Sequence, residues 1–382
     1  MEVPSLSSTN QVMRIMHIAS GDLWAGAEVQ LFTLVKTLAA MEGNELYVVL
    51  MNEDELARRL RDTGVSVFVI EESQHSSWQI FRHLQGLMGQ IQPHIIHTHR
   101  LKENILGALA NHFSVRAYSL RTVHGAPEFS YSFYKQTAKW FISRLDQWVG
   151  RYLQSHVIAV SQPLADQLSD KYPPEHIRVV LNGVDEAALG SVQSLGFDDA
   201  GFEGDSRVKH IGMVGRLVAV KRVDIFLAMA KTLIESGGSE YRFHIVGDGP
   251  LLEMLKSQAT NAGLEGKVIF YGHRGDVAKI IKGLDVLVMC SDHEGLPMTA
   301  LESLALGVPI VAHAVGGLAP LLSGVDGCAL VSRHRYEAYV EAVLSLLDSA
   351  GREDLVLPLK YSARGNAQAM VQVYSEGIEC LK

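Results

Sequence analysis

The stretch "SDHEGLPMTALESLALGVPIV", residues 291–311, leads from one short apolar run, "DVLVMC", into the next, "VPIVAH". Between the two runs lie a loop with Gly and Pro and a segment with helical spacing. A strand, a helix and a second strand in this order are typical of a parallel sheet built from βαβ units. The stretch therefore predicts an α/β fold.

The same alternation recurs on both sides of one interruption. At 382 residues the chain is long enough for two cores. The pattern lapses over residues 186–206, which are rich in Gly, Ser and Asp and which we interpret as a linker. Strands are expected at 12–20, 45–51, 65–70, 94–99, 117–123, 156–161 and 177–182, and then at 208–215, 242–249, 267–273, 285–291 and 308–317. Helices between them include 27–41 and 77–91.

We therefore predict two Rossmann-like, doubly wound domains, 1–186 and 207–361, with a hinge near 183–207. A last helix, within 362–382, either stays on the second domain or crosses back to the first, and the sequence leaves both alternatives open.

Composition and charge narrow the class of protein. A net charge of −8 argues against a nucleic-acid partner, which calls for a clustered basic face. Cys290, Cys328 and Cys380 are far apart and suggest neither a disulfide framework nor a zinc site. The first ten residues do not resemble a secretion signal, and no apolar run reaches the ~18–20 residues that span a bilayer. These features predict a cytosolic protein.

Polar and Gly-rich motifs follow the predicted strands of the second half. Ligands of open α/β sheets bind outside the carboxyl ends of the strands. Turns after strands favour Gly and Asp in any case, so one such motif is weak evidence, but five on one rim outline a site. The five are Gly215 with Arg216 and Lys221, "GDGP" at 247–250, Gly272 with His273, "SDHEGLP" at 291–297, and Gly316 with Gly317.

The side chains at this rim suit a nucleotide-sugar. Arg216 and Lys221 place two positive charges where a diphosphate would bind, unless they belong to an ordinary solvated turn. Glu302, inside the helical segment, can accept both hydroxyls of a ribose. Glu294, in the loop, can reach the hydroxyls of a different group, although loop carboxylates are often only solvated.

The helix that contains Glu302 adds a second anion-binding feature. Pro297 is suited to the first helical position. The amides of Leu296, Met298 and Thr299 would then head a helix N-terminus, which attracts phosphate.

In order and spacing, these motifs resemble the retaining glycosyltransferases of family 4, which have the GT-B architecture of two Rossmann-like domains facing across a cleft. The resemblance covers nearly the whole chain. It rests on "AGAE" (25–28), "VHG" (123–125), "NGVD" (182–185), "GRLVAVK" (215–221), "GDGP" (247–250) and the pair Glu294 and Glu302.

The resemblance implies a role for each matching residue. Arg216 and Lys221 would stabilise the departing diphosphate, Glu302 would bind the ribose and Glu294 the donor sugar. His124 would face the sugar and the acceptor. The backbone at Gly26 would contact the phosphate or the acceptor. Further backbone contacts to the donor would come from Gly215, Gly247, Leu296, Met298 and Thr299.

The family also implies that no cofactor and no divalent metal ion assist at the diphosphate. Two positions depart from the family pattern: Ala25 stands where a first Gly is usual, and Arg222 follows Lys221 where many relatives have Gly.

Two further patterns allow a functional and an ordinary interpretation. His97 and His99 would share one face of a strand, which fits a metal site but fits packing at the domain cleft better. Segment 133–153 has an apolar stripe that is expected in the core, formed by Tyr134, Ala138, Phe141, Leu145, Trp148 and Tyr152. Its other face carries Lys135, Lys139, Trp140, Arg144 and Arg151, and either is an ordinary solvated face or makes a peripheral contact with the inner side of an anionic membrane.

We conclude from the sequence that the chain transfers a hexosyl or N-acetylhexosaminyl group from a nucleoside-diphosphate sugar to a hydroxyl of a glycan or lipid-linked acceptor. By family prevalence the setting is surface polysaccharide or lipopolysaccharide synthesis. A GT-B epimerase acting on a nucleotide-sugar stays an alternative. A nicotinamide-dependent oxidoreductase is a weaker one, because neither "GDLWAGAE" nor "GDGPLL" spells G-x-G-x-x-G.

Overall fold

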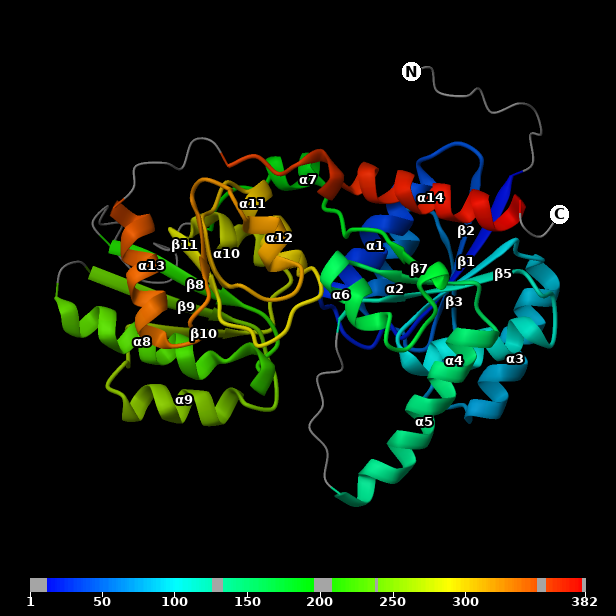
Figure 1. Cartoon of the computed structure of the whole chain (residues 1–382), viewed down its shortest axis with the longest axis horizontal. Coiled ribbons are helices and arrows are strands. Elements are labelled where there is room, and N and C mark those ends of the chain that lie inside the picture. Colours follow the sequence, from blue (N-terminus) through cyan, green and yellow to red (C-terminus); the bar gives the residue numbers. More distant parts are fainter. Residues whose placement is uncertain (1–11, 126–132, 196–207, 238–239, 349–354, 380–382) are drawn as a thin grey trace.

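The computed structural model describes residues 12–125, 133–195, 208–237, 240–348 and 355–379. The chain folds into two parallel sheets with helices on their faces, as predicted (Figure 1).

The first sheet has seven strands in the order β3-β2-β1-β4-β5-β6-β7. Its β-branched runs are buried on both faces, as parallel strands covered by helices should be. The strands are β1 (Met13–Ala19), β2 (Asn44–Leu50), β3 (Ser66–Val69), β4 (Ile95–His99), β5 (Tyr118–Val123), β6 (His156–Ala159) and β7 (Ile177–Val179). The helices of this half are α1 (Gly26–Ala39), α2 (Glu55–Asp62), α3 (Ser77–Ile91), α4 (Leu101–His112), α5 (Phe133–Tyr152), α6 (Gln162–Leu168) and α7 (Glu186–Gly190).

The second sheet has six strands in the order β10-β9-β8-β11-β12-β13. They are β8 (Val208–Val214), β9 (Glu240–Val246), β10 (Val268–Gly272), β11 (Val286–Met289), β12 (Ile310–His313) and β13 (Cys328–Val331). The helices of this half are α8 (Val223–Ser236), α9 (Leu252–Asn261), α10 (Val277–Gly283), α11 (Met298–Ala305), α12 (Leu318–Leu322) and α13 (Tyr336–Asp348). The sequence did not predict β13, which pairs with β12 so that Ile310 lies opposite Cys328.

The C-terminal helix α14 (Ala363–Glu379) crosses back to the first sheet, which settles the alternative that the sequence left open (Figure 1). Its Tyr374 hydroxyl lies 2.7 Å from Nδ1 of His97 on β4. Its Asn366 accepts a hydrogen bond of 3.0 Å from Gln30 on α1. At Gly377 an added Cβ would lie 2.2 Å from the Tyr118 ring, so only glycine allows the helix to approach the sheet this closely.

The two halves share one buried cluster of side chains. Val160 and Leu164 of the first half pack in it together with Leu296, Leu301 and Leu322 of the second. Across the same junction, Asn182 donates a 2.7 Å hydrogen bond to the carbonyl of Leu296. The carboxyl ends of the two sheets therefore meet near residues 294–298.

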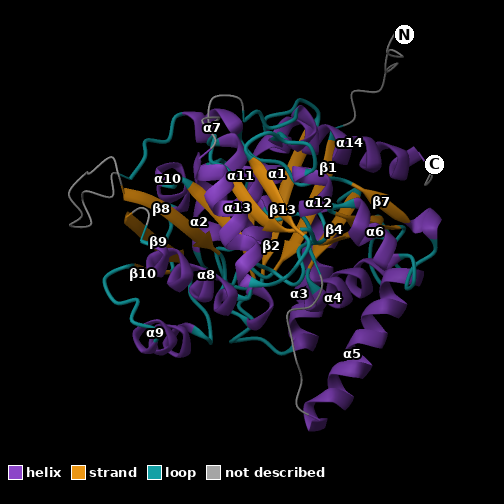
Figure 2. Ribbon diagram, turned by 60° about the vertical axis from the view of Figure 1, so that its left-hand side comes forward, coloured by secondary structure: helices purple, strands orange, loops and turns teal. Residues whose placement is uncertain are grey.

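Helix α5 projects from the body of the molecule in both views (Figures 1 and 2). Its attachment to the first half lies near its C-terminal end, where Val149 is buried and Asp146 pairs with Arg121 at 2.8 Å. The predicted core stripe is wrong for this helix, because Phe141, Trp148 and Tyr152 are 66%, 49% and 64% exposed. Helical spacing identifies an apolar face but not what covers it. The side chains of Tyr134, Lys135, Ala138 and Lys139 lie outside the described residues.

Among the helices of the described ranges, none combines the length and apolar character that crossing a membrane requires.

Candidate active site

Loops that follow five strands of the second sheet contact one another, as the sequence predicted. The amide of Leu217 donates to the Asp248 carbonyl and that of Gly247 to the Gly272 carbonyl, each over 2.8 Å. On the other side, the amide of Asp292 donates to the carbonyl of Val220, and the amide of Gly317 donates to the carbonyl of Gly295, also over 2.8 Å. The rim is therefore one connected backbone structure.

Two glycines make this packing possible. At Gly247, where φ is +136°, a Cβ would lie 1.9 Å from the carbonyl oxygen of Gly215. At Gly316, where φ is +50°, a Cβ would lie 1.7 Å from the carbonyl oxygen of Glu294. Any side chain at either position would push two rim loops apart.

Lys221 and Glu294, assigned above to the diphosphate and to the sugar, are direct partners. Nζ of Lys221 lies 2.6 Å from Oε1 of Glu294, and the two side chains are only 18% and 8% exposed. The Ser291 hydroxyl also donates to Oε1, over 2.6 Å. A short 3₁₀ turn, Ala219–Lys221, presents the lysine.

Arg222 occupies a left-handed backbone position with φ of +50° and ψ of +47°. This conformation favours glycine, which explains why Gly is usual at the corresponding place in the family. The Arg222 side chain pairs with Asp224 at 2.9 Å and Asp292 at 3.4 Å, and these ion pairs raise the pKa of its guanidinium. Arg216 is exposed on the rim directly after Gly215.

Helix α11 begins at Met298, with Pro297 as its N-cap at ψ of 132°, so the prediction that Pro297 is the first helical residue is wrong. An extended ψ at that position leaves the amides of Met298 and Thr299 at the open helix end. The side chains of Leu296 and Met298 are buried, so only their backbones can face a ligand. Burial raises the pKa of Glu302, one turn further along, to about 7.

From the first half, His124 and Gly26 reach the same place. A Cβ on Gly295 would lie 2.1 Å from the His124 carbonyl oxygen, and one on Gly26 would lie 3.9 Å from Cγ of Met298. Both residues therefore lie against the loop and helix start at 294–298. Burial and, to a lesser extent, the positive charge of nearby Arg100 lower the pKa of the His124 imidazole to about 4.

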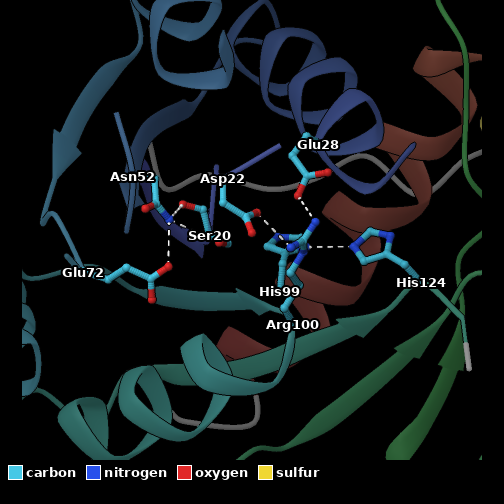
Figure 3. A network of polar contacts seen from close by, with 8 residues as sticks. All are labelled: Ser20, Asp22, Glu28, Asn52, Glu72, His99, Arg100 and His124. Carbon is cyan, nitrogen blue, oxygen red and sulfur yellow. Dashed lines mark hydrogen bonds and ion pairs between the residues drawn. The ribbon is translucent and has the colours of Figure 1, made fainter. Parts of the chain in front are cut away.

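A polar network at the end of β1 and β4 was not predicted (Figure 3). Arg100, with φ of +69°, pairs with Glu28 at 2.5 Å and with Asp22 at 2.9 Å. Burial raises the pKa of Glu28 to about 7, against the lowering effect of Arg100. Arg100 follows the carboxyl end of its strand directly, so the rule that identified the second-half rim would have found it here too.

His97 and His99 share one face of β4, as predicted, with ring centroids 4.4 Å apart. Together with His17 they place one nitrogen each within 4.8 Å of the others. Both nitrogens of His97 are already hydrogen bonded, to Tyr374 and to Thr122, at 2.7 Å each. A metal ligand would have to give up one of these bonds, so the geometry favours packing.

Comparisons with known proteins match both halves of the chain. The family description "Glycosyltransferase Family 4" matches residues 24–188, and "Glycosyl transferases group 1" matches residues 208–349. The chain belongs to glycosyltransferase family 4.

Individual relatives agree with this family. The glycosyltransferase is 25% identical over 363 residues, 90% of each chain, to the UDP-Gal:alpha-D-GlcNAc-diphosphoundecaprenol alpha-1,3-galactosyltransferase of Escherichia coli. Among solved structures, HepE of Anabaena in complex with UDP and glucose superposes with a TM-score of 0.80 at 18% identity, over 95% of this chain and 100% of that one. WaaG, of lipopolysaccharide biosynthesis, superposes with a TM-score of 0.68 at 14% identity, over 96% and 99%. The fold is therefore GT-B, and neither the epimerase nor the oxidoreductase alternative is favoured.

Proposed function

We propose that this glycosyltransferase moves a sugar from a nucleoside-diphosphate donor to a hydroxyl of a glycan or lipid-linked acceptor, with retention of the anomeric configuration. The E. coli relative is named for a UDP-galactose donor and a diphosphoundecaprenol-linked acceptor, and the HepE structures hold UDP and glucose. Relatives that act on lipopolysaccharide support a role in surface polysaccharide or lipopolysaccharide synthesis.

The Lys221–Glu294 pair is the observation that carries the proposal. It holds a cation and a carboxylate 2.6 Å apart under the rim, in a place where burial makes either charge costly without a partner. A donor that offers a diphosphate to Lys221 and hydroxyls to Glu294 would satisfy both charges at once.

The other rim residues complete the donor site in this proposal. Arg216 joins Lys221 at the diphosphate, and the amides of Met298 and Thr299 add the positive end of α11. Glu302 accepts from the ribose hydroxyls. The backbones of Gly215, Gly247 and Leu296 line the nucleotide. Because cationic side chains neutralise the diphosphate, the proposal assigns no divalent ion there.

The chemistry is a substitution on one face of the sugar. The bond between C1 and the diphosphate oxygen breaks, and the acceptor oxygen bonds to C1 from the same side. The acceptor proton passes to the departing phosphate oxygen. Arg216 and Lys221 stabilise the charge that develops on the diphosphate, and such preorganised charge is usually the largest catalytic contribution. Glu294 and His124 hold the oxocarbenium-like sugar between the two halves.

The test begins with thermal shifts against UDP, GDP and ADP, and continues with the sugars of the nucleotide that binds. Incubation with an acceptor should give a new glycosidic bond whose anomeric configuration, read by NMR coupling, equals that of the donor. An inverted product would contradict retention. An isomerised donor with no new bond would indicate the epimerase instead.

A peripheral membrane contact through α5 belongs to the same proposal, because a lipid-linked acceptor lies at a membrane surface. The projecting helix exposes Trp140, Phe141, Ile142 and Trp148 beside Arg144. Exposed aromatic rings with neighbouring cations suit the interface of an anionic bilayer.

A further inference from the structure

Three imidazoles form a hydrogen-bonded row that starts at the active site and ends in the core of the first half. Nε2 of His124 lies 3.3 Å from Nδ1 of His99, a contact drawn in Figure 3. Nε2 of His99 lies 3.1 Å from Nδ1 of His17. Burial lowers the pKa of His124 to about 4, that of His17 to about 3 and that of His99 well below its ordinary value. All three rings are therefore neutral near pH 7.

Neutral imidazoles in a row constrain one another. Each ring carries one N–H and one bare nitrogen, and each hydrogen bond needs one of each. Only two arrangements of the row satisfy both bonds. In the first, all three protons are on Nδ1, so His124 presents an N–H outward and His17 ends with a bare Nε2. In the second, all three protons are on Nε2, so His124 presents a bare Nδ1 outward and His17 ends with an N–H at Nε2.

Within the part of the chain that the structure describes, both ends of the row lack a hydrogen-bond partner. Nδ1 of His124 and Nε2 of His17 are buried, and neither finds a hydrogen bond within the described residues. Buried polar groups without partners are rare and call for an explanation. His99 and His124 both line a small cavity, whose wall has four further polar residues (Gln30, Thr122, Asn182 and Asn366) and six apolar ones (Leu31, Leu34, Ile158, Val160, Val180 and Met370).

The inner end of the row, at His17, decides between the two arrangements of the protons. A buried N–H without an acceptor is rarer in proteins than an acceptor left unsatisfied. The arrangement with a bare Nε2 on His17 places the remaining N–H on Nδ1 of His124 instead, and His124, unlike His17, lines a cavity in which an oxygen atom can accept that hydrogen bond. The protons therefore lie on Nδ1 throughout, and His124 Nδ1 is a hydrogen-bond donor.

We propose that His17 and His99 are positioning residues that fix His124 as an Nδ1–H donor to an oxygen of the bound sugar or acceptor. This inference rests on the proposed function and deepens it. His124 then donates a hydrogen bond in the reaction and does not remove a proton from the acceptor.

The chain provides a matched control. His97 is as buried as His17 and stacks in the same group, with its ring centroid 4.9 Å from that of His17. Its hydrogen bonds, however, go to Tyr374 and Thr122, so it lies outside the row.

The direct test is ¹⁵N NMR of histidine-labelled protein without substrate, which reports the protonated nitrogen of each neutral ring. The expected result is the Nδ1–H tautomer for His17, His99 and His124. Protonation of these rings on Nε2, or a mixture, would overturn the inference. So would one equivalent of tightly bound zinc on the purified protein, because the nitrogens would then be ligands.

Substitution gives the kinetic test. His17→Leu should lower kcat about tenfold, the value of one hydrogen bond, with nucleotide affinity unchanged. His17→Asn, whose amide N–H replaces that of Nδ1, should recover most of the loss. His97→Gln should leave kcat and the His124 signals as in the wild type, even where it lowers the Tm. Equal losses of kcat in His17→Leu and His97→Gln would show a merely structural role. If no sugar is transferred from any donor but the three rings are Nδ1–H tautomers, the result would contradict the proposed function and not the inference about the imidazole row.

Discussion

Lys221 and Glu294 are 73 positions apart in the chain, yet Nζ of one lies 2.6 Å from Oε1 of the other beneath the rim of the second sheet. The turn after β8 supplies the lysine and the loop after β11 supplies the glutamate. The pair is mostly buried, so each charge depends on the other, and replacing one should have consequences beyond the loss of a single contact.

The first prediction concerns this pair. Lys221→Ala should reduce the transfer rate on the order of 10²–10³-fold, by analogy with the loss of one preorganised donor. It should also lower the Tm, because Glu294 loses the charge that compensates it. Arg222→Gly is the control: it removes the adjacent cation but suits the left-handed backbone, so the rate should stay within about twofold of the wild type. A rate in Lys221→Ala equal to that of the control would refute the assignment.

Gly247 provides the second prediction. Gly247→Ala should abolish the thermal shift given by the nucleotide, because its Cβ would meet the Gly215 carbonyl oxygen at 1.9 Å and displace the loop that presents Arg216. Gly263→Ala is the control, since its φ of +71° also disfavours a side chain, although less strongly than +136° does, while no atom of the described residues lies within 4 Å of the added Cβ. Both variants should lose stability, but only Gly247→Ala should lose binding. If Gly247→Ala still binds the nucleotide, this loop does not contribute to donor binding.

A third prediction follows from Glu302, whose pKa burial raises to about 7. The carboxylate accepts ribose hydroxyls better than the neutral acid does, so nucleotide affinity should rise about tenfold from pH 6 to pH 8. Titration calorimetry measures it, and Glu302→Gln should bind weakly at both pH values, with only the dependence that comes from the nucleotide itself. If wild type and Glu302→Gln show the same pH dependence, the Glu302 carboxylate does not bind the ribose hydroxyls.

The same shift has an opposite consequence for stability. The pKa of Glu302 is higher in the folded protein than the ordinary value of 4.5, so the folded state holds the proton more tightly. Its contribution is complete below about pH 4.5 and is lost as the pH rises through about 7. Glu302→Gln should therefore raise the Tm relative to wild type at pH 8 and leave it nearly unchanged at about pH 4.

Membrane contact through α5 is the fourth prediction. Replacing Trp140, Phe141 and Trp148 with Ser should reduce sedimentation with vesicles that contain anionic lipid, because these exposed rings would enter the interface. Trp78→Ser on α3 removes a ring that is at least as exposed as these, at 67%, and should sediment as the wild type does. If the triple variant and the wild type sediment alike, α5 does not hold the protein on the membrane.

The rim could be predicted because the carboxyl ends of parallel strands meet at one edge, so residues as distant as Gly215 and Gly316 converge once the strands are recognised. The Lys221–Glu294 contact was not predicted, since the sequence assigned the two charges to different parts of a ligand. The projection of α5 and the return of α14 depend on tertiary packing, such as the 2.7 Å contact between His97 and Tyr374, 277 positions apart. No local pattern encodes such a contact.

The central claim is that the second half holds a diphosphate with Arg216 and Lys221 and a ribose with Glu302. A crystal structure with whichever of UDP, GDP or ADP gives the largest thermal shift tests it most directly. We expect both cations on the diphosphate oxygens, the ribose hydroxyls on Glu302, and Glu294 turned toward the place of the sugar. Nucleotide density elsewhere, with the Lys221–Glu294 pair undisturbed, would contradict the account.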